Sequence, residues 1–147
     1  MENRRQFTGC TVNSTPCRCF EKLTAEEREL LDANSVIIHY KKKEVICKQG
    51  AFVSDVMFVE EGLTKVFIDN GENSLVLKII PGRILLGLAS VSEEHNTYQY
   101  SAMAYIDTTI KQINIGIFRE LLQRNANFSK EVIDILSANS VQIYGRF

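Results

Sequence analysis

The fold is decided by the stretch Val56-Met-Phe-Val-Glu-Glu-Gly-Leu-Thr-Lys-Val-Phe-Ile68. Two short runs rich in β-branched and aromatic residues meet at Gly62, a residue type that supplies turns because it adopts positive φ without strain. In the second run the side chains alternate between two faces, as they do in a half-buried strand. One set is Leu63, Lys65 and Phe67, and the other is Thr64, Val66 and Ile68. We therefore predict two consecutive short strands with a turn at the glycine.

Similar β-rich runs occur on both sides of this stretch, between residues 35 and 115. They are Val36–Tyr40, Glu44–Lys48, Ser74–Ile80 and Tyr98–Ile113. Residues that favour turns stand between them, at Gly50, Asn70-Gly71 and Pro81-Gly82. Short runs at this close spacing are typical of an antiparallel sandwich, barrel or roll.

Helical patterns flank the β-rich region. Thr24 and Glu27 fit a capping box, which predicts a helix from about residue 25 to 32. The run Ile117–Leu122 predicts a short amphipathic helix, and apolar residues at helical spacing then predict a longer helix from Asn127 to Tyr144. Because this last pattern is still running at the end of the chain, we expect the chain to be a piece of a longer protein.

The composition fits one globular domain with an ordinary core. The chain has 147 residues, of which 45% are hydrophobic and 24% charged, and its net charge is −1. It lacks the basic surplus of a DNA-binding domain, and we interpret its one dense basic cluster, Lys41 to Lys43, as a solvated turn. No apolar run approaches the ~20 residues that span a bilayer, and the polar N-terminus is unlike a secretory signal. We therefore expect a cytoplasmic protein that binds neither membranes nor, by itself, nucleic acid.

An ordered set of motifs between Phe20 and Asn127 gives the chain a family resemblance. The motifs are Phe20-Glu-Lys-Leu23 with the preceding Cys19, Glu44-Val-Ile-Cys-Lys-Gln-Gly50, the stretch from Val56 to Val66, Leu77-Lys-Ile-Ile-Pro-Gly82, Leu86-Gly-Leu88, Ser101-Ala-Met-Ala104, and Phe118 with Leu121. In this order they resemble the catabolite-activator/FNR (CRP/FNR) family of transcription regulators. The resemblance implies a mainly β fold with flanking helices: a double-stranded β-helix or jelly-roll-like β-roll of the cyclic-nucleotide-binding type, followed by the start of a dimerisation helix.

The resemblance also implies how the chain is divided. Residues 1–19 are a cysteine-containing N-terminal segment, residues 20–126 the β-roll sensor domain, and residues 127–147 the start of the dimerisation helix. We expect the DNA-binding helix-turn-helix of the family to lie outside this chain. We also expect a homodimer, formed through a coiled-coil-like seam on the last helix. The seam residues are Val132, Ile133, Ile135, Leu136 and Ile143.

The cassette that binds cyclic nucleotides in this family is incomplete here. Family members hold the phosphate with backbone amides, an arginine and a serine, and the ribose hydroxyl with a glutamate. Alignment on Pro81-Gly82 and Ser101 puts Gly87 in place of the glutamate and Tyr100 in place of the arginine. The stretch 90–99 contains no Arg or Lys and carries two acidic residues. Because a buried phosphate charge must be paired, we predict that the domain does not respond to cyclic AMP.

The roll still encloses space for a less charged effector, either apolar or aromatic. Residues of the altered cassette could line such a pocket, and the alternative is that they simply fill the core of the roll. They are Leu86, Gly87, Leu88, Val91, Tyr98, Tyr100, Ser101 and Met103.

The N-terminal cysteines raise a metal or redox hypothesis. FNR-type sensors hold an iron–sulfur cluster on cysteines spaced Cys-x2-Cys-x5-Cys plus a distant fourth. Cys10 and Cys19 fit the outer positions, but Asn13 occupies the middle one, Cys17 is out of register, and Lys111 stands at the fourth position. Three interpretations remain open: an empty remnant, a cluster or zinc on Cys10, Cys17 and Cys19, or a reversible disulfide among these thiols. We expect Cys47, in a predicted strand, to pack as a small apolar residue.

The predicted function is therefore effector sensing in a CRP/FNR-type transcription regulator. The sequence contains no nucleophile elbow, phosphate-binding loop, metalloprotease helix or dinucleotide fingerprint, so we expect no enzyme activity. The alternative from another class is a cupin-like barrel that binds a small molecule or a metal, with or without catalysis. Such a barrel needs clustered histidines, and the sequence has only His39 and His95, which lie far apart.

Overall fold

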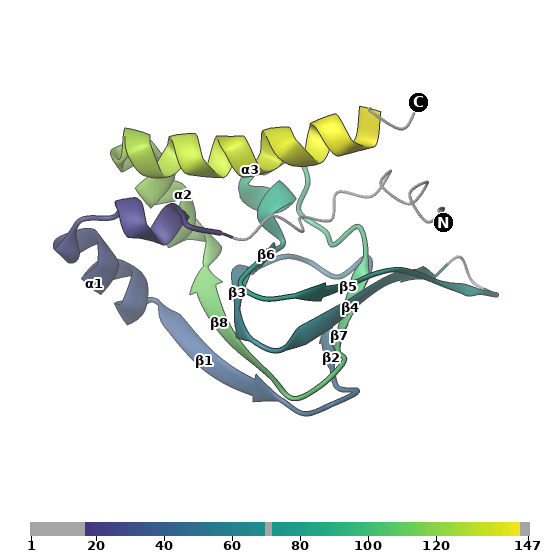
Figure 1. Ribbon diagram of the computed structural model, residues 1–147. Coiled ribbons are helices and arrows are strands. Elements are labelled where there is room, and N and C mark those ends of the chain that lie inside the picture. The colour runs from purple at the N-terminus through teal and green to yellow at the C-terminus, as the bar shows by residue number, and fades with distance from the viewer. Residues whose placement is uncertain (1–16, 70–71, 145–147) are drawn as a thin grey trace.

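The computed structural model describes residues 17–69 and 72–144 (Figure 1). The helices are η2 Cys19–Lys22, α1 Ala25–Ala33, η3 Leu88–Val91, α2 Ile115–Arg124 and α3 Ala126–Tyr144. The strands are β1 Ser35–Tyr40, β2 Val45–Cys47, β3 Asp55–Glu61, β4 Leu63–Asp69, β5 Ser74–Pro81, β6 Leu85–Leu86, β7 Ser101–Ala104 and β8 Thr108–Asn114. The side chains of residues 77 and 139–144 are not among those described.

The strands form a roll of two antiparallel sheets. One sheet has the order β1-β8-β3-β6 and the other β2-β7-β4-β5. Figure 1 shows α3 lying along one side of this roll, with η2 between α3 and the strands and α1 next to the start of β1. The predicted mainly β roll with flanking helices is confirmed. The strong pairings β1–β8 and β3–β8 join segments far apart in the sequence.

Strand β4 has the two faces that its alternating pattern predicts. Thr64 and Val66 are fully buried, whereas Lys65 and Phe67 are partly exposed. The same two faces continue into the neighbouring strands, because directly opposed residues of antiparallel strands lie on the same face. Val66 pairs with Ala102 on β7, so these two side chains belong to the inner face of the roll.

Strand β3 is buried on both faces, unlike β4. Four consecutive residues, Val56 to Val59, are buried. The ring of Phe58 packs edge-to-face on Phe20 of η2, with 5.0 Å between ring centroids, and its neighbour Val59 points to the opposite face. A continuous apolar run without alternation is the signal of such a strand, and the covering layer here is helical.

Two predicted elements have different limits in the structure. The run Tyr98–Ile113 contains two strands, β7 and β8, because the chain reverses at residues 105–107. The short helix predicted at 117–122 is the ten-residue α2, whose N-cap Asn114 accepts a hydrogen bond from the Ile117 amide (3.1 Å). The turn predicted at Asn70-Gly71 lies outside the described residues.

The predicted capping box is present at the start of α1. The hydroxyl of Thr24 accepts a hydrogen bond from the Glu27 amide (3.1 Å), and the Glu27 carboxylate accepts one from the Thr24 amide (3.0 Å). The side-chain amide of Asn125 donates to the same carboxylate (2.8 Å). These hydrogen bonds to the charged form lower the pKa of Glu27. The box therefore also attaches α1 to the junction of α2 and α3.

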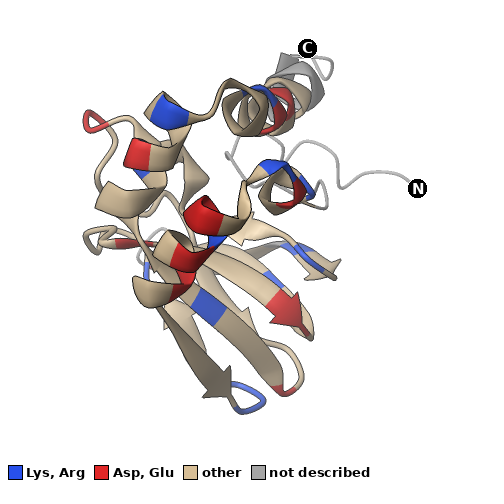
Figure 2. Ribbon diagram, turned by 90° about the vertical axis from the view of Figure 1, so that its left-hand side faces the viewer, with Lys and Arg blue, Asp and Glu red and all other residues tan. Residues whose placement is uncertain are grey.

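The surface carries mixed charge. Figure 2, which faces α1, shows acidic residues gathered on that helix and basic residues scattered over the strands. Lys41 to Lys43 are exposed between β1 and β2, as the interpretation of a solvated turn requires. No helix among residues 17–69 and 72–144 is both long and apolar enough to cross a membrane.

Gly62 between β3 and β4 is required for close packing as well as for its backbone conformation. Its φ is +126°, and a Cβ at this position would lie 2.7 Å from Cβ and 2.8 Å from Cα of Thr108 on β8. Gly50 also has positive φ (+87°), but nothing lies within 4 Å of a Cβ added there. A side chain at Gly50 would therefore introduce backbone strain alone, whereas a side chain at Gly62 would add steric overlap with Thr108.

We predict that Gly62→Ala lowers the free energy of unfolding by about 2–4 kcal/mol, because the methyl group collides with backbone and side chain of β8. Gly50→Ala, the matched control, should cost about 1–2 kcal/mol from backbone strain alone. Urea denaturation followed by circular dichroism measures both. Equal losses for the two variants would contradict the close approach of Gly62 to Thr108.

Candidate functional site

The candidate site is centred on Gly87, which follows β6 and begins η3. Its φ of +81° is left-handed, and a Cβ there would lie 3.3 Å from Val53 Cγ1, 3.4 Å from the Asp55 carbonyl oxygen and 3.4 Å from Tyr98 Cε1. A side chain at this position would need both a strained backbone and displacement of its neighbours. A glutamate, which holds the ribose in cyclic-nucleotide-binding relatives, would be strained at this position, and the glycine present offers no carboxylate.

Tyr100 occupies the space beside Gly87. Its side chain is buried, and its hydroxyl oxygen accepts a hydrogen bond from the Gly87 amide (3.2 Å). The ring of Tyr98 packs edge-to-face against it, with 6.3 Å between centroids. Burial raises the pKa of Tyr98, so this phenol is neutral at physiological pH. Tyr100 thus stands where the resemblance requires a cation, and a second aromatic side chain, Tyr98, packs against it.

Of the eight predicted pocket residues, the structure buries five near the start of η3, leaves Val91 partly buried at its end, and directs two elsewhere. Leu86, Gly87, Leu88, Tyr98 and Tyr100 are all buried around the start of η3. Met103 and Ser101 pair with Lys65 and Phe67, and therefore belong to the outer face of their sheet. Side chains along a strand alternate between faces, so these two point away from the inner face on which Ala102 and Ala104 lie.

Ser101 has a structural partner on the outer face. Its hydroxyl oxygen accepts a hydrogen bond from the Gln49 amide (2.9 Å), and the Gln49 side chain in turn accepts from the Asp69 amide (3.0 Å). This arrangement fixes the loop after β2 against β4 and β7. The serine shared with nucleotide-binding relatives therefore supports a loop in this chain.

Sequence reasoning assigned no role to Thr64, which the structure singles out. Its side chain lies on the inner face of β4 and is fully buried, opposite Ala104 and Ile80 on the two adjacent strands. The hydroxyl oxygen has no hydrogen-bond partner among the described residues. An unsatisfied buried hydroxyl costs free energy, and a bound ligand or water is one way to recover it. One indication was present in the sequence, since the polar Thr64 stands in the same alternating set as the apolar Val66 and Ile68.

The helix η3 is attached directly to α2. The guanidinium of Arg119 donates hydrogen bonds to the carbonyl oxygens of Ser90 (2.8 Å) and Val91 (3.1 Å) at the end of η3. A movement of η3 would therefore displace α2, which leads into α3. Sequence reasoning did not identify Arg119, because nothing in its neighbourhood marks a contact to a loop about thirty residues away.

The cysteines do not form a metal centre among the described residues. Cys17 and Cys19 are joined by a disulfide, with 5.6 Å between their Cα atoms, and Cys10 lies outside the described residues. No group of three His, Cys, Asp or Glu in residues 17–69 and 72–144 is placed to hold a metal ion. Lys111, at the fourth cluster position, forms a salt bridge with Asp32.

Cys47 is the free cysteine of the described residues and packs as predicted. It is buried on β2 opposite Ala102. Burial raises its pKa to about 12, which keeps it as an unreactive thiol at neutral pH. It therefore behaves as a small apolar core residue.

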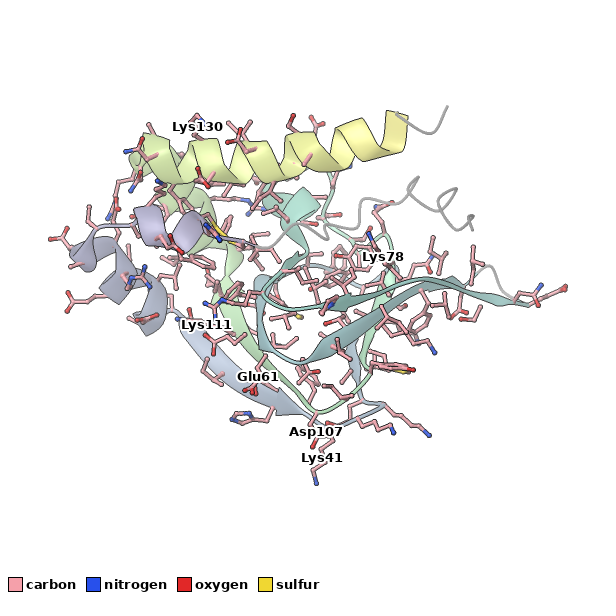
Figure 3. All side chains as sticks on the ribbon, viewed as in Figure 1. Lys41, Glu61, Lys78, Asp107, Lys111 and Lys130 are labelled. Carbon is pink, nitrogen blue, oxygen red and sulfur yellow. A yellow bond between two sulfur atoms is a disulfide. The ribbon has the colours of Figure 1, made fainter. Side chains whose placement is uncertain are left out.

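An open groove at the far end of the roll contains one of the two histidines. His39 is exposed there, with Nδ1 3.1 Å from the Thr109 hydroxyl. Figure 3 shows Lys41, Glu61 and Asp107 at this end, on the side opposite to α3. The groove encloses about 640 Å³ and is lined by residues 39–41, 61–63 and 106–109. His95 is exposed in the loop after η3, so the two histidines do not meet.

The seam predicted on the last helix is divided between two faces of α3. Val132 and Ile135 are only 2% and 5% exposed and pack into the core of the chain itself. Ile133 is 60% exposed, and Leu136 is partly buried. The side chain of Ile143 is outside the described residues. A seam that uses Val132 and Ile135 would need these residues to leave the core, because the roll and α3 share one apolar interior.

Comparisons with known proteins agree on the fold. Residues 37–125 match the family model of the cyclic nucleotide-binding domain. The crystal structure of the sensor domain of the transcriptional regulator DNR from Pseudomonas aeruginosa is similar, with a TM-score of 0.75 and 18% identity over 88% of this chain and 87% of that chain. A transcriptional regulator from Thermotoga maritima has a TM-score of 0.72 and 17% identity, covering 81% of this chain and 92% of its own.

A longer relative in structure is the catabolite activator protein from Thermus thermophilus. Its TM-score is 0.60 with 21% identity, covering 87% of this chain and 56% of that protein. The chain thus spans little more than half the length of that regulator. No curated protein matches the sequence. These findings do not favour the cupin-like alternative, since the matching family and folds are of another kind.

We predict that Thr64→Val raises the free energy of unfolding by about 1 kcal/mol, because it removes a buried hydroxyl that has no partner. Thr108→Val is the matched control. The Thr108 hydroxyl is equally buried but donates to the carbonyl oxygens of Ile106 (2.8 Å) and Leu63 (3.2 Å), so its loss should destabilise by a similar amount. Urea denaturation measures both changes. A destabilised Thr64→Val variant would mean that its hydroxyl is hydrogen-bonded in solution.

Proposed function

The chain belongs to the cyclic nucleotide-binding domain family, and we propose that it is the effector-sensing domain of a DNA-binding transcription regulator of the CRP/FNR type. The sensor-domain fold shared with DNR supports this role. DNA contact would be made by another part of the protein, because this chain has a net charge of −1 and lacks the basic surplus of a DNA-binding domain. We propose a regulatory role without catalysis, in the cytoplasm.

The effector in this proposal is not a cyclic nucleotide. The observation that carries this is the hydrogen bond between the Tyr100 hydroxyl and the Gly87 amide. It engages a backbone amide of the cassette and places a neutral phenol where a phosphodiester would need a cation. Gly87 supplies no carboxylate for the ribose, and its positive φ would strain a glutamate there. A nucleotide would therefore lose its charge pairing and its sugar contact together.

We propose instead a small effector of low charge, bound inside the roll near η3. The buried side chains next to Gly87 are apolar or aromatic, and such surfaces favour apolar ligands by burial of area. They are Val53, Leu86, Leu88, Tyr98 and Tyr100. Thr64 supplies a hydroxyl on the inner face of the roll that a polar atom of the effector could satisfy.

The signal in this proposal travels from η3 to α2 and then to α3. Arg119 holds the end of η3 to α2. Asn125, between α2 and α3, accepts a hydrogen bond from the Phe128 amide (2.9 Å) and so caps the start of α3. An effector that shifts η3 would thus tilt α3, which in an intact regulator would reposition the DNA-binding part.

We also propose that the sensor acts as a homodimer through α3. The inner stripe of this helix, Phe128, Val132 and Ile135, is already buried within the chain. The exposed Ile133, with the partly buried Leu136 three residues later, is the part of the predicted seam that remains available to a partner. Removal of residues from 129 onward would destroy the core and is therefore unsuitable as a test of dimerisation.

Isothermal titration calorimetry tests the effector proposal. We predict no binding of cyclic AMP or cyclic GMP up to about 1 mM nucleotide, which corresponds to a binding free energy weaker than about −4 kcal/mol. The reason is the missing cation beside the phosphate. A cyclic-AMP-binding member of the family, titrated in parallel, serves as the positive control. A micromolar dissociation constant for either nucleotide would reject the proposal.

Sedimentation equilibrium tests the dimer. We predict that Ile133→Asp raises the dimer dissociation constant at least about tenfold, because burying each isoleucine contributes about 1.5–3 kcal/mol. Lys130→Ser is the matched control on the same helix, since its side chain is exposed and pairs only with Asp134 (3.1 Å). An Ile133→Asp protein that dimerises as tightly as the control would rule out this seam.

A further inference from the structure

We propose that the Cys17–Cys19 disulfide is a redox-controlled clamp that holds η2 between the roll and the start of α3. Reduction of this bond would loosen η2 and release the first turns of α3. The inference concerns a second input to the domain and does not depend on the identity of the effector or on the dimer.

The disulfide is attached to the roll. The amide of Cys17 donates a hydrogen bond to the carbonyl oxygen of Arg83 (2.7 Å), in the turn between β5 and β6. Cys19 begins η2 and is fully buried, while Cys17 is 6% exposed. The bond therefore joins a residue that is hydrogen-bonded to the roll to the first residue of η2.

Phe20, directly after Cys19, connects the roll with both C-terminal helices. Its ring contacts Phe58 of β3 (centroids 5.0 Å apart) and Phe128 of α3 (6.1 Å). Phe128 in turn packs edge-to-face on Phe118 of α2 (5.3 Å). Arg83 completes the row, with its guanidinium 4.9 Å from the Phe58 ring centroid. The position of Phe20 thus influences how α3 lies on the roll.

The other end of η2 is attached to the cap of α3. The side-chain amide of Asn125 donates to the carbonyl oxygen of Lys22 (3.0 Å), while its oxygen accepts from the Phe128 amide. The residue that caps α3 therefore depends on η2 for part of its own position. Figure 1 shows η2 lying alongside the first turns of α3.

Reduction changes the space that the two sulfur atoms need. A dithiol reductant supplies two electrons and two protons: the S–S bond breaks, two thiols form, and the dithiol becomes a cyclic disulfide. Two thiols must then separate to van der Waals contact, which is longer than a covalent bond. In a close-packed interior this extra length displaces neighbours, and Phe20 is the neighbour in the chain. Oxidised dithiol reverses the reaction by thiol–disulfide exchange.

The size of the ring makes this effect local. Only one residue, Arg18, separates the two cysteines, and a disulfide that closes so short a loop restricts the unfolded chain little compared with one that closes a long loop. Its main consequence is the conformation of η2 and not global stability. In a reducing compartment, disulfides that do form are usually transient or redox-sensing, which fits a switch.

The experiment compares oxidised and reduced protein in a Cys10→Ser background, which removes the other N-terminal thiol. Samples are equilibrated with oxidised glutathione or with reduced dithiothreitol, quenched and unfolded, and the thiols are alkylated and counted by mass spectrometry. Cys47 serves as an internal reference, because it is a free cysteine and should be alkylated in both redox states once the protein is unfolded. Hydrogen–deuterium exchange is then measured on peptides covering residues 17–23, 126–136 and 101–114.

We predict that reduction accelerates exchange by on the order of tenfold or more in residues 17–23 and 126–136, with no change in β7 and β8. A Cys17→Ser/Cys19→Ser variant should behave like the reduced protein under both conditions. Should that variant fail to fold, the comparison of oxidised with reduced Cys10→Ser protein still tests the clamp. Identical exchange in both redox states, or free thiols at Cys17 and Cys19 under oxidising conditions, would overturn the clamp. Neither result would bear on the effector proposal, which nucleotide titration tests separately.

Discussion

Closure of the two sheets onto one interior is the constraint on which the rest of the molecule depends. Val66 of β4 and Ala102 of β7 lie side by side on the inner face of one sheet, and neither side chain exposes any surface. A close-packed interior of this kind tolerates neither an unpaired charge nor an extra atom. At Gly62 the limit is steric, because Thr108 of β8 occupies the space that a side chain would need. At Tyr100 the limit is electrostatic, because a phenol stands where relatives have a cation.

The same constraint determines how α3 is used. The helix covers the end of the core and contributes Phe128, Val132 and Ile135 to it. It is therefore part of the sensor domain as well as a potential contact to a partner. Its start is held from two directions: through Asn125 to η2 and α1, and through α2 and Arg119 to η3. An event at η3 and an event at the disulfide would both act on this helix.

Much of the fold was predictable because local chemistry and tertiary structure agree at several positions. The Thr24–Glu27 box starts a helix where it predicts one. The alternation in β4 matches its buried and exposed faces. Other features were not predictable. The buried run of β3 gives no indication of what covers it, and the covering residue Phe20 is 38 positions earlier in the chain. Likewise, Arg119 and η3 meet only because the roll brings the end of β8 beside the loop after β6.

The sequence by itself determined the order helix, β-roll, helix, the turns at Gly50, Gly62 and Pro81-Gly82, and the absence of the arginine and glutamate that a cyclic nucleotide needs. These depend on residue type and on spacing along the chain. Only the tertiary structure decided that Met103 and Ser101 face outward, that Val132 and Ile135 are buried within the chain, and that the Thr64 hydroxyl has no partner among the described residues. The physical reason is that periodicity defines two faces of a strand or helix, whereas burial depends on which distant segments come to lie against them.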